Sequence, residues 1–200
     1  MAKFLVLGVK HHLKEGTPLD EVMERVTPKM RVGLEISPQA LRLLLEFIRG
    51  GHKLPEAAEL GLTEESVEDV KFFKELVERI VSTGATPVPL NREKQWRKSS
   101  EYLERLRTET NSIPKDLRTL LKHDELVKKY KRVSKLESKF KLGIFMESML
   151  MLKHAVKKKV DVAVMGSLHA KHIEGITRPG ALKVEYLSKA DVSEFSKYLP

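Results

Sequence analysis

Five short apolar runs separated by helix-like stretches are the feature that most constrains the fold of this chain. The runs lie at residues 3–8, 31–35, 86–90, 161–166 and 181–187. Between them, hydrophobic residues recur every three or four positions, which is typical of amphipathic helices. Strands that alternate with helices favour an α/β fold with a mainly parallel sheet flanked by helices. In such folds ligands bind beyond the carboxyl ends of the strands.

Capping residues and prolines indicate where several helices begin. Thr17-Pro18 and Ser37-Pro38 each place a capping side chain before a proline at the first helical position. Thr63 is expected to cap a longer helix that ends at Gly84. The two prolines within residues 86–90 indicate an edge strand or a bulge.

The positive charge of the chain is concentrated in its middle. Residues 91–160 hold 20 basic and 9 acidic residues, whereas the whole chain has a formal charge of +9. Apolar spacing predicts two helices between residues 96 and 130 and a more apolar helix over residues 140–156, and a closing helix is expected at 192–199. We therefore expect one α/β domain over residues 1–200, with residues 91–160 as a basic helical insertion or cap.

Composition removes several classes of protein. The 200 residues include no cysteine, which excludes disulfide scaffolds, cysteine-type zinc sites and thiol nucleophiles. No apolar run is long enough to span a bilayer, so we expect a cytoplasmic protein with no membrane association. Charged residues make up 32% of the chain, and this composition is typical of thermophiles.

Histidines and a glutamate follow three of the expected strands. Gly8 and His11 form a G-x-x-H motif after the first strand, and Gly166 and His169 form a second after the fourth. Glu35 ends the second strand. Two imidazoles and a carboxylate suit Zn, Mn or Fe and leave positions open for water. The alternative is that the histidines hydrogen-bond backbone or cap helices, and that Glu35 faces solvent or pairs with a lysine.

Four further polar residues lie near these motifs. His12 and His172 are expected to surround the site or to be exposed. Glu147 is a candidate second catalytic carboxylate beside Glu35, although a solvated helical glutamate is the simpler interpretation. Ser148 interrupts an apolar helix, and the sequence assigns it no role.

The order of these motifs resembles that of the TraB/PrgY–TIKI superfamily, which includes the erythromycin esterase and ChaN-like groups. The similar segments are residues 3–50 and 140–176. The resemblance implies a parallel-sheet core with both histidines and the acidic residues facing one cleft. Its members are described as metal-dependent proteases, as hydrolases and as haem binders. Residues 143–149 lack the arginine that the family often has before the last motif strand, and Gly175-Ile176 comes three residues later than in the family pattern.

Three functions follow as hypotheses. The first is a protease- or esterase-like hydrolase that acts on a peptide or small molecule through a divalent metal bound by His11, Glu35 and His169. The second is a nucleic-acid-binding protein that uses residues 91–160, although no nucleic-acid-binding signature is evident. The third is a non-catalytic haem- or small-ligand-binding module. The amphipathic helices are equally compatible with a homo-oligomer.

Overall fold

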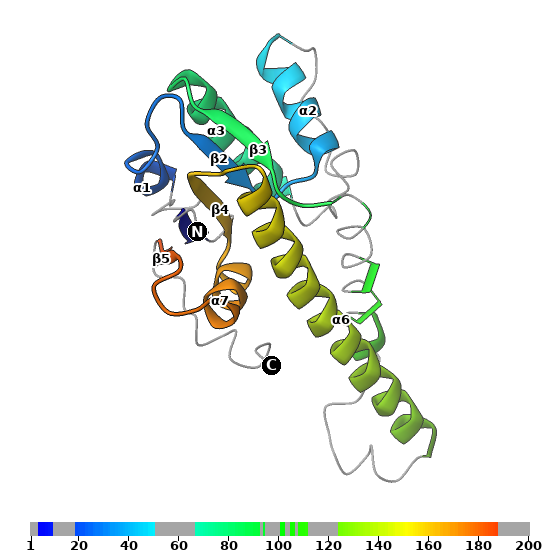
Figure 1. Cartoon of the computed structure of the whole chain (residues 1–200). Helices are drawn as coiled ribbons and strands as arrows, with labels where there is room; N and C mark the ends of the chain where they lie inside the picture. Colours follow the sequence, from blue (N-terminus) through cyan, green and yellow to red (C-terminus); the bar gives the residue numbers. More distant parts are fainter. Residues whose placement is uncertain are drawn as a thin grey trace.

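The computed structural model describes residues 4–9, 19–50, 67–92, 94, 101–102, 105–106, 108–111 and 124–187. Five strands and five main helices are described there, and Figure 1 shows their arrangement. The strands are β1 (Leu5–Val9), β2 (Arg31–Leu34), β3 (Thr86–Pro89), β4 (Val162–Gly166) and β5 (Lys183–Tyr186). The helices are α1 (Leu19–Met23), α2 (Pro38–Ile48), α3 (Val67–Ser82), α6 (Asp124–Lys157) and α7 (Ser167–Ile176).

The strands form one sheet in the order β3-β2-β4-β1-β5, with every pairing parallel. This arrangement confirms the predicted α/β fold. β3 lies at an edge, which suits its two prolines because an edge strand leaves one side of its backbone unpaired. β4 lies between β2 and β1, so the carboxyl ends of these three strands are neighbours.

Local sequence accounts for the start of α2. The Ser37 side chain accepts a hydrogen bond from the backbone N–H of Ala40 at 3.1 Å, and Pro38 occupies the first turn. A capping hydroxyl of this kind satisfies an N–H group that has no partner within the helix. The predicted capped start of this helix is confirmed.

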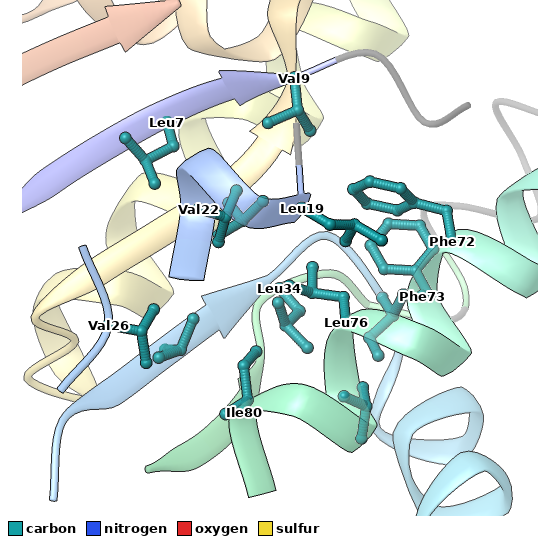
Figure 2. Close-up of a cluster of buried hydrophobic side chains, with 14 of the residues drawn as sticks. Leu7, Val9, Leu19, Val22, Val26, Leu34, Phe72, Phe73, Leu76 and Ile80 are labelled. Atoms are coloured by element: carbon teal, nitrogen blue, oxygen red, sulfur yellow. The ribbon is translucent and has the colours of Figure 1, made fainter. Parts of the chain in front are cut away.

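The sheet separates two hydrophobic cores. Alternate residues of a strand point to opposite faces, and in β4 Val162 and Val164 join one core while Ala163 and Met165 join the other. The larger core lies between the sheet and helices α1, α2 and α3 (Figure 2). The smaller core includes buried residues of α6 and α7. The two cores fix the two helical layers around the sheet.

α6 differs from the prediction in length and in its buried face. Residues 124–157 form one helix of 34 residues, whereas the apolar spacing had suggested a break between residues 130 and 140. The Asp124 end of α6 extends well beyond the sheet in Figure 1, while the other end lies against it. The apolar spacing predicts that Ile144 and Met149 are buried positions of this helix. Ile144 is buried, whereas Met149 is 42% exposed and Met151 is fully buried instead.

Some predicted features lie outside the described residues. These are Thr63, most of the helices expected in residues 92–123, the closing helix at 192–199, and both His11 and His12. Within the described part of the chain, no helix combines the length and the apolar character that crossing a bilayer requires.

Candidate active site

Glu35 and His169 meet at the carboxyl edge of the sheet. Glu35 follows β2, and His169 lies in the first turn of α7, directly after β4. Because β2 and β4 are neighbours, these two residues are brought together, and Glu35 Oε1 lies 3.0 Å from His169 Nε2. Their side chains are only 13% and 11% exposed, so water screens this contact poorly. α7 begins at Ser167, directly after β4, so His169 lies inside the helix.

The second oxygen of Glu35 is held by the start of α7. The backbone N–H of Gly166 donates to Glu35 Oε2 at 2.5 Å. Gly166 is the N-cap of α7, and the amino end of a helix carries a partial positive charge that favours an anion. The Ser167 hydroxyl donates to the carbonyl oxygen of Val9 at 3.3 Å, so the same turn is also tied to the end of β1.

Ser148 of α6 joins His169 and His172 through one hydroxyl group. It donates its single proton to the carbonyl oxygen of Ile144, 2.9 Å away. The Ser148 oxygen lies 2.8 Å from His169 Nδ1 and 3.1 Å from His172 Nδ1. With its proton used on Ile144, this oxygen accepts from both Nδ1–H groups. His169 Nε2 is then the nitrogen that faces Glu35.

The spacing of buried residues along α6 could have indicated that Ser148 is buried. Ile144, Met151 and Ala155 lie on the buried face of α6, and position 148 shares their three- and four-residue spacing. Ser148 is completely buried. A small polar residue in phase with an apolar stripe therefore marked a buried polar contact.

Glu147 and His172 complete a buried polar group around the pair. Both side chains are buried, with 3% exposure each. The interpretation of Glu147 as a solvated helical glutamate is therefore wrong, because the α6 face that carries it packs inward. The His172 ring also makes an edge-to-face contact with Phe145, with 5.6 Å between ring centroids.

Two carboxylates control the charge of His169. Burial alone lowers its pKa, but the charge and hydrogen bond of Glu35 and the charge of Glu147 outweigh burial. The pKa of His169 therefore lies above its usual 6.5. The imidazolium form is therefore more favoured at this site than in a free histidine, and in that form Nε2–H is directed at Glu35.

Gly8, the first glycine of the predicted motifs, has a packing role. A Cβ at this position would lie 2.8 Å from Tyr186 Cδ1 and 3.0 Å from Ala170 Cβ. Only glycine therefore lets β1 approach α7 and β5 this closely. This contact fixes the position of the helix that carries His169.

The Glu35–His169 contact has the spacing of two ligands on one metal ion. Two donor atoms that are each about 2.0–2.2 Å from one zinc ion lie roughly 3.0–3.5 Å apart. The Nε2–Oε1 distance is 3.0 Å, and His169 already donates its other ring N–H to Ser148, as metal-binding histidines commonly do. Among the described residues, no group of three side chains is placed to hold a metal. The third expected ligand, His11, lies outside them.

Comparisons with protein-family models, with curated proteins and with solved structures found no match for this chain. The similarity to the TraB/PrgY–TIKI superfamily therefore stays a prediction. What bears on function is the chemistry of the buried carboxylates and imidazoles at the edge of the sheet.

Proposed function

We propose that this chain is a metal-dependent hydrolase whose centre lies beyond β2 and β4. One observation carries the proposal: Glu35 Oε1 and His169 Nε2 lie 3.0 Å apart while Ser148 engages the opposite ring nitrogen. Once the Nε2 proton is lost, an imidazole nitrogen and a carboxylate oxygen lie side by side, and these are two of the donor types that bind divalent metals in proteins. His11, which follows β1, is the proposed third ligand.

The position of the pair in the sheet supports the proposal. The loop after β4 leads to α7 on one face, whereas the loop after β2 leads to α2, which packs on the other face. A point where neighbouring strands send their connections to opposite faces is the usual ligand site of an open α/β sheet. Glu35 and His169 flank this point.

Each side chain has a definite part in the proposed chemistry. A bound divalent metal would polarise the substrate carbonyl and lower the pKa of a water. Glu35 and His169 would hold this metal, and Ser148 keeps the His169 ring in its orientation. Glu147 would accept a proton from the attacking water and return it to the leaving group. His172, hydrogen-bonded to the same hydroxyl, holds Ser148 in place.

Ser148 is unsuited to act as a nucleophile. A serine, a histidine and a carboxylate in sequence have the connectivity of a hydrolytic triad. The Ser148 hydroxyl, however, is fully buried and donates its proton to Ile144 within its own helix. It has no proton to give to His169, so we assign it the role of a positioning residue.

The order of motifs supports membership of the TraB/PrgY–TIKI superfamily. We propose a peptide, ester or amide as substrate and the cytoplasm as the site of action.

The test is hydrolysis of fluorogenic peptides and p-nitrophenyl esters by the untagged protein, with Zn²⁺, Mn²⁺ or Fe²⁺ added. We expect turnover that chelation abolishes and metal restores. His169→Ala and Glu35→Gln should lose it, while Glu174→Gln, at the exposed end of α7, should keep it. The absence of turnover with every metal and both substrate classes would refute the proposal.

A further inference from the structure

A pocket at the carboxyl end of α6 is lined only by basic residues, and neither Glu35 nor His169 is among them. It has a volume of about 520 Å³ and lies between the end of α6, the start of β2 and the segment that follows β3. Its lining residues are Arg31, Arg92, Lys153, His154, Lys157, Lys158 and Lys159. Six of these carry a full positive charge at neutral pH.

The cations of this pocket have no carboxylate partners within the described part of the chain. No ion pair joins any of them to a described aspartate or glutamate, whereas ion pairs are common on α3 and elsewhere on α6. The nearest acidic contact is that of Asp161, and its carboxylate accepts from the backbone N–H of Arg31 at 2.8 Å. Among the described residues, therefore, no carboxylate neutralises the positive charge of the pocket.

His154 orients Arg92 toward the pocket. The His154 Nδ1–H donates to the carbonyl oxygen of Leu90 at 2.6 Å, which leaves Nε2 as an acceptor. Arg92 Nε–H donates to this Nε2 at 3.2 Å. The two terminal nitrogens of the guanidinium are then available as a fork, the geometry that binds phosphate oxygens in pairs.

Lys158 is similarly fixed and is crowded by like charges. Its ammonium group donates to the carbonyl oxygen of Pro89 at 2.6 Å. Burial, followed by the charges of Arg31 and Lys157, lowers the pKa of Lys158. An anion in the pocket would relieve this repulsion.

The carboxyl end of a helix attracts cations by itself, and this attraction accounts for Lys157 and the residues next to it. It does not account for Arg31, which begins β2, or for Arg92, which follows β3, and both line the same pocket. The basic residues are therefore gathered from three separate segments of the chain. Basic side chains from three segments around one pocket indicate a site for an anionic ligand.

We propose that this pocket binds a small polyphosphate-bearing molecule, such as a nucleoside triphosphate, at a site distinct from the Glu35–His169 pair. The volume lies within the range of small-ligand pockets, which is about 300–1,000 Å³. Six lysine and arginine side chains around one pocket match a chain of phosphates better than they match a single carboxylate. This inference does not depend on the proposed hydrolase activity.

The test is isothermal titration of the full chain with inorganic triphosphate, with ATP and with adenosine. We expect one equivalent of triphosphate or ATP to bind and adenosine to show no binding. Arg92→Gln and Lys157→Gln should each weaken triphosphate binding by about tenfold or more, the loss of a charge-assisted contact. Lys139→Gln, an exposed charge on the same helix, is the matched control, and thermal unfolding checks that each variant folds.

Three results would overturn the proposal. The first is no saturable binding of triphosphate or ATP to the folded wild-type protein. The second is an equal loss for Lys139→Gln, which would indicate general attraction to a basic surface. The third is tighter binding of a single-stranded oligonucleotide that the same two pocket variants weaken, which would assign the surface to nucleic acid.

Discussion

The hydroxyl of Ser148 lies 2.8 Å from Nδ1 of His169, on the side of the imidazole ring opposite Glu35. This contact determines which ring nitrogen faces the carboxylate. A hydrogen bond that joins α7 to α6 thus sets the orientation of the His169 ring at the carboxyl edge of the sheet. The chemistry of the site depends on a helix that the spacing of apolar residues marks only as core.

Ser148→Ala should destabilise the protein and weaken its hold on metal. The change leaves two buried Nδ1–H groups without their acceptor, at a cost of about 1–3 kcal/mol each in the free energy of unfolding. Metal affinity should fall by roughly 10–100-fold, as when other contacts that orient a ligand are lost. Urea denaturation and metal titration measure the two effects.

Ser138→Ala is the matched control for Ser148→Ala. Ser138 donates to the carbonyl oxygen of Ser134 in the same helix, but it is exposed to solvent. Its replacement should change the unfolding free energy by no more than about 0.5 kcal/mol. An equal loss of stability in the two variants would show that the effect comes from the hydrogen bond within α6 and not from the contacts with the two histidines.

Glu147→Gln should separate catalysis from metal binding. Loss of the proposed general base should lower the rate of hydrolysis by roughly 10²–10⁴-fold. The bound metal, counted by elemental analysis, should stay at the wild-type amount because Glu147 is not a proposed ligand. Glu137→Gln, at a partly exposed position of α6 that pairs with Lys141, should leave the rate unchanged. A fall in metal content for Glu147→Gln would make it a ligand instead of a base.

Gly8→Ala should destabilise the fold because a Cβ would collide with the Tyr186 ring and the Ala170 side chain. Overpacking of this kind costs about 1–3 kcal/mol. Gly175→Ala is the control, since it adds the same atom to α7 with nothing within 4 Å. That change should stabilise the helix by about 0.5–1 kcal/mol. Thermal unfolding that ranks the variants in the reverse order would contradict the packing around β1.

Glu185→Gln should reduce stability at neutral pH but have little effect in acid. Hydrogen bonds from Lys183 and then Arg25 hold the pKa of Glu185 below its usual 4.5. The stabilising contribution is therefore complete above pH 4.5 and is lost as the pH falls through the lower folded-state pKa. Unfolding at a series of pH values should show a difference of about 0.5–1 kcal/mol at pH 7 that shrinks as the pH falls below 4.5. A difference that persists in acid would mean that the ion pairs are not its source.

The sequence predicts the sheet well because each strand is a short apolar run with a clear boundary. The prolines of Thr86–Pro89 indicated an edge strand or a bulge, and β3 is an edge strand. Ser37-Pro38 marked the start of α2. The same logic placed Glu35 and His169 at strand ends. It did not say that β2 and β4 are neighbours, because strand order follows from packing among distant segments.

The interior of the site was harder to predict than its strand ends. Glu147 and Ser148 look like interruptions of an apolar helix when only hydrophobic residues are counted. Both are buried because the face of α6 that carries Met151 continues past the hydrophobic core to the polar edge of the sheet. A buried polar residue becomes recognisable only when its partners, here His169 and His172, are known.

Metal content is the measurement that tests the central claim most directly. The untagged protein would be equilibrated with Zn²⁺, Mn²⁺ or Fe²⁺, freed of excess metal, and analysed for bound metal per chain. We predict one equivalent for the wild type, a loss of most of it in His169→Ala and in Glu35→Gln, and full retention in Glu174→Gln. Wild-type protein that binds no metal, or both site variants retaining a full equivalent, would contradict the assignment of Glu35 and His169 as ligands.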